Sequence, residues 1–238
     1  MAPETFKVIL AQKIQRTPTV TSFRFSSAEK INFIPGQFLK IILDQNHPEN
    51  KDLNKFLSFS CSPENNYVEV TKRLSASLFS QNLSGLKLKD QVFIQAPFGD
   101  CVLKEEFKKN AFLIGGIGIT PVISIIEYII NKKLDTDILL FYSNRTEEEI
   151  AFRPELDIWA KSNSNLKLYY ILTDCQPKDN SCSFGRINKE LLSSKIKDPQ
   201  ERVFFTFGPP KMVEAMNQLC LEIGGLKENL RTESFAGY

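Results

Sequence analysis

The stretch of this sequence that most constrains its fold is Gly115–Pro121, which reads GGIGITP. A short apolar run of β-prone residues precedes it, and a long apolar run at helical spacing follows it. This order predicts a strand that turns directly into the beginning of a helix. Glycines let the backbone turn tightly and approach a ligand, and free N–H groups at a helix start attract a phosphate. A structural corner without a ligand is the alternative.

The stretch departs from the usual dinucleotide-binding pattern of three spaced glycines. Counted from Gly116, that pattern requires a third glycine at position 121, and this chain has Pro121 there. Proline fits the first turn of a helix, because the N–H groups of that turn have no partner within the helix. We therefore expect the helix to begin at Pro121, with Thr120 before it as the N-cap.

The N-terminal part of the chain carries the pattern of β-structure. Runs rich in Val, Ile, Phe and Thr alternate with turn-forming clusters that contain Pro, Gly and Asn, and one short helix is expected at 76–83. Short strands separated by polar turns favour a six-stranded antiparallel barrel. The expected strands are 6–11, 20–25, 38–43, 56–61, 66–71 and 91–96.

From residue 111 onward the pattern becomes an alternation of strands and helices. Such an order predicts a parallel sheet with helices on its faces, as in nucleotide-binding α/β domains. We place the boundary in the charged stretch 104–110, which gives a barrel domain at 1–106 and an α/β domain at 107–238. The strands are expected at 111–115, 137–142, 166–173 and 202–207, and the helices at 121–133, 153–161, 187–194 and 210–223.

Composition argues against several classes of function. The 30 basic and 28 acidic residues give a net charge of +2, which offers no basis for nucleic-acid binding. The five cysteines form no CxxC pair and no cluster with histidine, so we expect no metal site, and reduced thiols suit a cytoplasmic protein. The apolar segment 111–130 contains Glu127 and the glycine turn, so we expect a buried helix there and no membrane span.

Six short motifs occur along the chain in a definite order. They are PGQF at 35–38, KFLS at 55–58, PFG at 97–99, GGIGITP at 115–121, FGPP at 207–210 and ESFAGY at 233–238. In this order and at these separations, the chain resembles the ferredoxin–NADP⁺ reductase family. The resemblance implies a flavin-binding barrel followed by a nicotinamide-binding α/β domain, with FAD and either NADP or NAD as cofactors.

The motif KFLS stands where the family usually has an Arg-x-Tyr-Ser strand that holds the flavin. The resemblance gives Ser58 a hydrogen bond near flavin N5, the atom that accepts hydride. Lys55 replaces the arginine and keeps a positive charge for the FAD pyrophosphate, without the two-pronged guanidinium. Leu57 replaces the tyrosine and would support one flavin face with an aliphatic group. An ordinary half-buried strand is the alternative.

Two further segments of the barrel are expected at the flavin by the same resemblance. The backbone around Val70 and Lys72 would line the flavin ring. Ser77, or Ser75 close to it, would open a short helix and meet the FAD pyrophosphate, because hydroxyl and free N–H groups suit phosphate. A plain helix N-cap would have the same sequence. A pyrophosphate contact of this kind favours FAD over FMN.

In the α/β domain the resemblance assigns the dinucleotide pyrophosphate to the glycine stretch. The residues expected there are Gly116, Gly118, Thr120 and Pro121. Gly208 and Pro209 of the FGPP motif are also expected at the nicotinamide cofactor. Family members often have a cysteine before this Gly-Pro pair, whereas this chain has Phe207, which we expect to be a core residue.

The choice between NADP and NAD depends on the residues after the strand 137–142. Folds that select NAD commonly place an acidic residue near this point for the ribose 2′-hydroxyl. This chain offers Ser143, Asn144 and Arg145, and an arginine can pair with the 2′-phosphate of NADP. NADPH is therefore favoured, although a solvated arginine that balances Glu147–Glu149 is equally consistent with the sequence.

The last motif, ESFAGY, is expected near the reacting centre. The resemblance implies that Phe235 or Tyr238 stacks on the flavin ring and holds the place that nicotinamide must take. Glu233 would help to orient the reacting ring. We thus predict Ser58, Glu233 and Tyr238 as catalytic residues. A frayed terminus is the alternative.

The resemblance implies a flavin-dependent oxidoreductase that passes hydride from NAD(P)H to FAD, and electrons on to a separate acceptor. A ferredoxin, a flavodoxin, an oxygenase partner or a small molecule would serve as that acceptor. The departures at Lys55, Leu57 and Phe207 leave a second function open, that of a degenerate, non-catalytic nucleotide-binding regulatory or structural subunit. A flavin-free dehydrogenase is the least favoured, because it leaves the barrel without a role.

Overall fold

The computed structural model describes residues 2–235, which form two compact units. The first unit comprises Met1–Leu103 and Thr120–Asn131, and the second comprises Lys104–Ile119 and Lys132–Tyr238. The chain therefore changes unit inside the glycine stretch, between Ile119 and Thr120. Because this grouping assigns a helix after the glycine turn to the first unit, the domain boundary after residue 106 stays a prediction.

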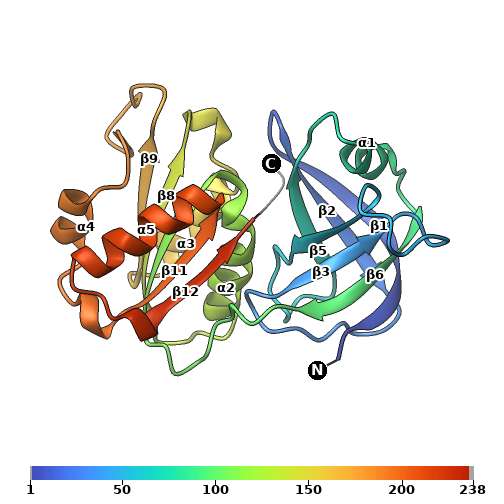
Figure 1. Ribbon diagram of the computed structural model, residues 1–238, viewed down its shortest axis with the longest axis horizontal. Coiled ribbons are helices and arrows are strands. Elements are labelled where there is room, and N and C mark those ends of the chain that lie inside the picture. Colours follow the sequence, from blue (N-terminus) through green and yellow to red (C-terminus); the bar gives the residue numbers. More distant parts are fainter. Residues whose placement is uncertain (1, 236–238) are drawn as a thin grey trace. The chain divides into compact units, whose positions relative to one another are not determined.

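The first unit is built on a six-stranded antiparallel sheet, as the sequence predicts. Its edge strands are β4 and β5, and an isolated antiparallel bridge between Phe59 and Val70 joins these two edges into a barrel (Figure 1). Buried aliphatic and aromatic side chains fill its interior. The strands are β1 (Glu4–Thr17), β2 (Val20–Ser27), β3 (Phe38–Ile42), β4 (Asn54–Ser58), β5 (Val68–Arg73) and β6 (Gln91–Phe98), in the order β4-β3-β6-β1-β2-β5.

Four elements of the barrel, β1, β4, β5 and α1, begin two residues away from their expected positions in the sequence. The strand expected at 56–61 is β4, which starts earlier and ends at Ser58. The reason is that the chain after Ser58 crosses to the opposite edge, where the Ser60 N–H donates to the Glu69 carbonyl at 2.8 Å. The helix expected at 76–83 is α1 (Leu78–Gly85).

The second unit contains a six-stranded parallel sheet, of which the sequence predicts four strands correctly. The two edge strands β10 and β12 were not expected, because three-residue CSF and polar LRTES carry little apolar periodicity. Only their pairing with a neighbour identifies them. The order is β10-β9-β8-β7-β11-β12, with β7 (Lys109–Gly115), β8 (Asp137–Asn144), β9 (Leu166–Leu172), β10 (Cys182–Phe184), β11 (Val203–Gly208) and β12 (Leu230–Ser234).

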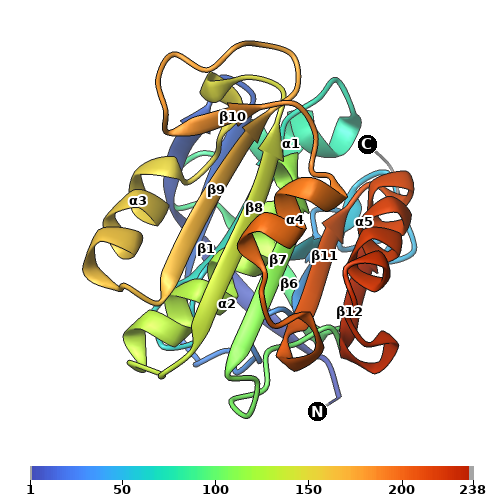
Figure 2. The ribbon, with the colours of Figure 1, turned by 90° about the vertical axis from the view of Figure 1, so that its left-hand side faces the viewer.

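The helices of this unit lie on both faces of the parallel sheet, as expected. Helices α4 (Lys189–Lys195) and α5 (Pro210–Glu222) cover one face and share a core with it (Figure 2). Helix α3 (Arg153–Ser162) packs on the opposite face of β9, where the Tyr170 hydroxyl donates to Asp157 at 2.9 Å. All strands of a parallel sheet end at the same edge, so the residues that follow the neighbouring strands β7, β8 and β11 lie close together.

Helix α2 (Ile119–Asn131) is buried on nearly all sides, as the apolar run predicts. It begins at Ile119, directly after a 3₁₀ turn at Gly116–Gly118. Thr120 is therefore not the N-cap: it lies within the first turn together with Pro121, because the 3₁₀ turn already starts the helical path. Within residues 2–235, no helix has the length and apolarity that a membrane crossing requires.

A buried arginine ties together the amino ends of the parallel strands. Arg202 is 5% exposed and donates to Asp137 and to Asp198, each at 2.6 Å. Lys109 also contacts Asp198 at 2.7 Å. The guanidinium thus links the start of β8 to the loop before β11, and its removal would take one ionic partner away from Asp137 and one away from Asp198.

We expect Arg202→Met to lower the free energy of unfolding by about 2–3 kcal/mol, because breaking one side of a buried ion pair strands the other. Thermal unfolding followed by circular dichroism measures the effect. Lys104→Met provides the control, since Lys104 contacts Glu106 at 3.7 Å with both side chains mostly exposed. Equal melting temperatures for the two variants would contradict a structural role for Arg202.

Candidate functional site

Strand β4 carries two of the predicted flavin residues on one face, where Leu57 is half-buried and Lys55 is exposed. Lys55 pairs across the strands with Ile41, and Leu57 pairs with Leu39, both of which are fully buried. Paired residues of antiparallel strands carry their side chains on the same face. Leu57 accordingly packs against the barrel core, while Lys55 lies on the same face nearer the start of the strand.

The opposite barrel edge supplies a second lysine. Val70 is fully buried in the core, and Lys72 is on the same face of β5 two residues later. Burial and then the charge of Lys55 lower the pKa of Lys72. The two ammonium groups therefore repel each other across the gap between β4 and β5. An anionic group between them would remove this repulsion, which fits a pyrophosphate.

Three serines gather at the beginning of α1. Ser77 is the N-cap, and its side chain accepts from the Ser80 N–H at 3.3 Å. The Ser75 hydroxyl donates to that of Ser77 at 3.1 Å, and Ser77 donates to the buried Ser80 hydroxyl at 3.1 Å. The N-cap interpretation is thus confirmed, and the phosphate contact stays a prediction. Ser80 is not among the residues predicted from the sequence, although it follows Ser77 by three residues, which is the spacing of a helix-capping pair.

The end of β4 is where three sequence motifs of the barrel meet. Phe38 of PGQF pairs with Ser58 of KFLS on one side and with Phe98 of PFG on the other. The Gln37 side chain donates to the Gly99 carbonyl at 3.0 Å. Ser58 itself is 8% exposed. Residues far apart in the sequence are therefore positioned by a single strand, β3.

In the second unit the glycine stretch lies against the FGPP motif. A Cβ atom on Gly118 would lie 2.3 Å from the Phe207 carbonyl oxygen, so no other residue fits that position. Gly116 has φ of 51° and Gly208 has φ of 154°, conformations that favour glycine. The Tyr142 hydroxyl donates to the Gly116 carbonyl at 3.1 Å. These contacts place the ends of β7, β8 and β11 side by side.

A cavity of about 590 Å³ lies in the second unit beside this turn. Apolar, polar and charged side chains line it, and Ser143 is the one predicted residue among them. Its principal lining residues are Ser143, Thr173, Arg186, Ile187, Lys211 and Met212.

The two cations of this cavity were not found from the sequence. Arg186 follows β10, an edge strand that the sequence does not reveal, whereas Lys211 comes directly after FGPP and could have been noticed there. The predicted residue Arg145 does not line the cavity. Its side chain is 75% exposed and lies 4.0 Å from Asp174.

The end of β12 carries the predicted Glu233 and Phe235. Glu233 pairs with Phe207 across the strands, and burial raises its pKa to about 7. The Phe235 N–H donates to the Gly208 carbonyl at 2.9 Å, and its ring stacks 6.4 Å from that of the buried Phe207. Phe207 is thus a core residue, as expected. Tyr238 lies outside the described residues.

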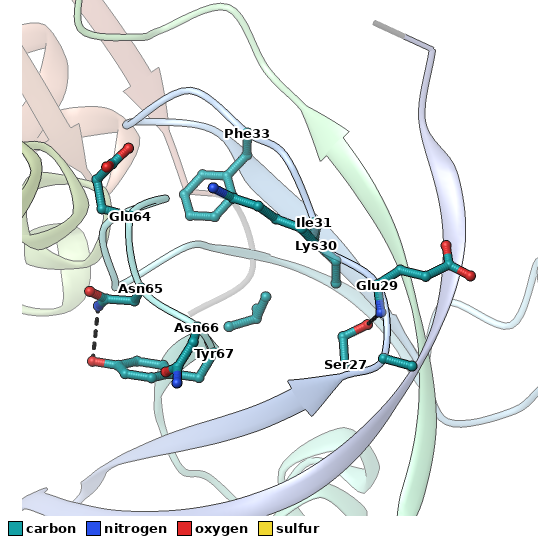
Figure 3. Close-up of a pocket in the computed structure, with 11 residues that line it drawn as sticks. Ser27, Glu29, Lys30, Ile31, Phe33, Glu64, Asn65, Asn66 and Tyr67 are labelled. Atoms are coloured by element: carbon teal, nitrogen blue, oxygen red, sulfur yellow. Dashed lines mark hydrogen bonds between the residues drawn. The ribbon is translucent and has the colours of Figure 1, made fainter.

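A second cavity, of about 320 Å³, lies in the first unit between the segments 27–33 and 64–68. Figure 3 shows Phe33 on one of its sides and Asn65 and Tyr67 on another, with the Asn65 amide donating to the Tyr67 hydroxyl at 3.0 Å. None of the predicted cofactor-binding residues lines it. The residues that the structure describes include no cluster of three or more potential metal ligands.

Comparison with known proteins agrees with this arrangement. Residues 112–218 match the model of the oxidoreductase NAD-binding domain. Over 248 residues the chain is 25% identical to flavohemoprotein A of Dictyostelium discoideum, covering 98% of this chain and 60% of that protein. Over 197 residues it is 30% identical to one component of the Na⁺-translocating NADH-quinone reductase of Pseudoalteromonas atlantica, covering 81% of this chain and 47% of that component. The chain thus spans about half the length of these curated relatives.

A solved structure extends the likeness to the whole fold. The ferredoxin–NADP⁺ reductase of Neisseria gonorrhoeae, determined with bound FAD and NADP, superposes with a TM-score of 0.80 at 21% identity. The match covers 98% of this chain and 99% of that one. Both the antiparallel barrel and the parallel sheet are therefore parts of one known two-domain architecture. Residues 112–218 thus match the oxidoreductase NAD-binding domain, and the chain as a whole has the two-domain fold of ferredoxin–NADP⁺ reductases.

Proposed function

We propose that this protein is an FAD-dependent reductase that takes hydride from NAD(P)H and passes electrons to a separate acceptor. One observation carries the proposal: each unit gathers the cofactor motifs of the family at one place. The barrel brings PGQF, KFLS and PFG together at the end of β4. The parallel sheet brings GGIGITP against FGPP, with no room for a side chain on Gly118.

FAD, when bound, accepts the hydride and releases electrons singly, and the protein supplies position and charge. In the barrel, the facing Lys55 and Lys72 would neutralise the FAD pyrophosphate. Leu57 would support the flavin ring with its aliphatic side chain, and the hydroxyl of the buried Ser58 would donate to the ring edge. These residues fit FAD, because two cations and a capped helix start meet the needs of a diphosphate.

For the second cofactor we propose NADPH. The cavity beside the glycine turn offers Arg186 and Lys211 for a 2′-phosphate and Ser143 for a ribose hydroxyl. The apolar side chains that line it, among them Ile187 and Met212, suit an adenine ring. Arg145 contributes less in this proposal, because it is mostly exposed and faces Asp174.

The acceptor is proposed to be a separate molecule, with a small redox protein as the first candidate. The names of the two relatives point to different redox groups, a haem in one and a quinone in the other. Neither acceptor can be transferred to this chain, since it spans only part of each relative. The shared element is the reductase module that these residues match.

Anaerobic titration of the purified protein tests the proposal. We expect a yellow protein, or one that becomes yellow with added FAD, whose flavin absorbance bleaches on addition of NADPH and returns with an electron acceptor. A heat-inactivated sample controls for direct reduction of free flavin. A colourless protein that takes up no FAD would instead support a non-catalytic subunit.

The raised pKa of Glu233 makes the folding stability of the protein depend on pH, in a direction that follows from the sign of the shift. Burial raises the pKa of its carboxyl to about 7, above the ordinary value near 4.3 in an unfolded chain. Between these two values the folded protein binds more protons than the unfolded one, so folding stability falls as the pH rises toward about 7. Glutamine stays neutral. We therefore expect the melting temperature of Glu233→Gln to exceed that of the wild type by an amount that grows from about pH 5 to about pH 8.

The same substitution separates stability from catalysis. If Glu233 orients the reacting ring, the rate of flavin reduction by NADPH has an inflection near pH 7 that is absent from Glu233→Gln. Stopped-flow reduction at a series of pH values measures it. Parallel pH profiles for the two proteins would remove Glu233 from the catalytic residues.

A further inference from the structure

The last residue of β8, Asn144, carries a buried amide that the residues described in the structure leave unsatisfied. Asn144 is 4% exposed, and both its Oδ1 and its Nδ2 are buried without a hydrogen-bond partner among residues 2–235. Buried polar side chains in folded proteins nearly always have partners, so such an exception requires a physical reason. An apolar side chain of the same shape would be the more stable choice.

The position of this amide points to the glycine turn. The ladder between β7 and β8 ends at the pair Gly115 and Ser143, so Asn144 stands one residue further, where the chain of β7 turns at Gly116. Side chains alternate along a strand, which puts Asn144 on the same face as Tyr142. The Tyr142 hydroxyl donates to the Gly116 carbonyl at 3.1 Å. The unsatisfied amide therefore lies on the side of the sheet to which the turn is attached.

We propose that Asn144 is a positioning residue for the nicotinamide dinucleotide, and that its amide hydrogen-bonds to the backbone of the Gly116–Gly118 turn when the dinucleotide is bound. The inference rests on the proposed function, because it requires a ligand at the turn. The amide atoms are too deeply buried for direct contact with a ligand. Backbone at glycine is the most adaptable in a protein, so a small change of the turn can bring a partner to Asn144.

The proposal predicts opposite changes in stability and in binding. Asn144→Leu removes an amide that has no partner in the free protein, so the melting temperature without dinucleotide should rise by about 2–4 °C. The same variant cannot hold the turn in its bound form, so the dissociation constant for NADP⁺, measured by calorimetry on the FAD-loaded protein, should rise about tenfold. The FAD content should not change.

Asn110→Leu is the matched control. Asn110 is also buried and its Oδ1 likewise has no partner among the described residues, but it lies at the opposite end of β7 and its Nδ2 donates to the Phe107 carbonyl at 2.9 Å. This variant should lose stability and bind NADP⁺ as the wild type does. Should Asn144→Leu fail to fold, Asn144→Ala provides the same binding measurement with a smaller side chain.

The outcomes separate the inference from the proposed function. Wild-type affinity in a folded Asn144 variant would overturn the positioning role, as would a loss of stability without a loss of affinity. A wild-type protein that binds FAD but neither NADP⁺ nor NAD⁺ would overturn the proposed function, and the inference with it.

Discussion

Replacing Gly118 by alanine is expected to reduce the rate of flavin reduction by NADPH at least about 100-fold. The added Cβ would lie 2.3 Å from the carbonyl oxygen of Phe207 and 2.8 Å from its carbonyl carbon. Both are backbone atoms, so the glycine turn and the end of β11 must move apart. A displacement of about 1 Å at a site that positions a reactant is enough for a loss of this size. We also expect a loss of about 1–3 kcal/mol in stability from overpacking.

Stopped-flow reduction of the FAD-loaded variant measures this effect, and its FAD content shows that the barrel is intact. Gly85→Ala is the matched control, because a Cβ on Gly85 would meet no atom within 4 Å. That control should keep wild-type rates. A Gly118→Ala variant that is reduced at the wild-type rate would show that the turn does not position the dinucleotide.

The second large effect is expected in the choice of nicotinamide cofactor. Arg186→Ala should lower kcat/KM for NADPH about 10- to 50-fold and leave that for NADH nearly unchanged, because a charge-assisted hydrogen bond to phosphate contributes about 1.5–3 kcal/mol. Lys211→Ala should act in the same direction by about 5-fold, since a flexible lysine loses more entropy on binding. Steady-state kinetics with both cofactors and a fixed acceptor measures the ratio.

The Arg145→Ala variant tests whether the cations of the cavity or the loop after β8 recognises the 2′-phosphate of NADPH. If the cavity cations recognise the 2′-phosphate, this variant keeps the preference of the wild type, because Arg145 does not line the cavity. If the ratio of NADPH to NADH activity instead falls with Arg145→Ala and not with Arg186→Ala, the loop recognises the phosphate.

Raising the salt concentration should weaken NADPH binding more than NADH binding in the wild type.

Much of the fold could be read from periodicity. The six barrel strands and the four central strands of the parallel sheet carry long runs of β-branched and aromatic residues, which their burial on one or both faces requires. The two edge strands β10 and β12 are short and polar, because each is paired along one side only. Their existence depends on a neighbour, which no local pattern records.

The candidate site was predictable wherever a motif determines local backbone. Gly116 and Gly118 were identified for the freedom of their backbone and Gly208 through the FGPP motif, and the structure gives each a positive φ or a contact that excludes a side chain. Ser77 was identified as a helix opener and is the N-cap of α1. Arg186 could not be found this way, because its importance comes from a cavity. Asn144 is one of the residues that the sequence offers after the strand 137–142, but its missing hydrogen-bond partners are visible only in the structure.

By itself, the sequence determined that Gly115–Pro121 joins a strand to a buried helix, since spacing and glycine content are local properties. Only the tertiary structure decided why Gly118 can be nothing else: the carbonyl of Phe207, 89 positions away in the sequence, occupies the space of its side chain. It likewise brought the barrel lysines Lys55 and Lys72, which lie on the two edge strands of one sheet, near enough for their charges to interact. Contacts of this kind depend on chain closure, and a linear pattern does not contain them.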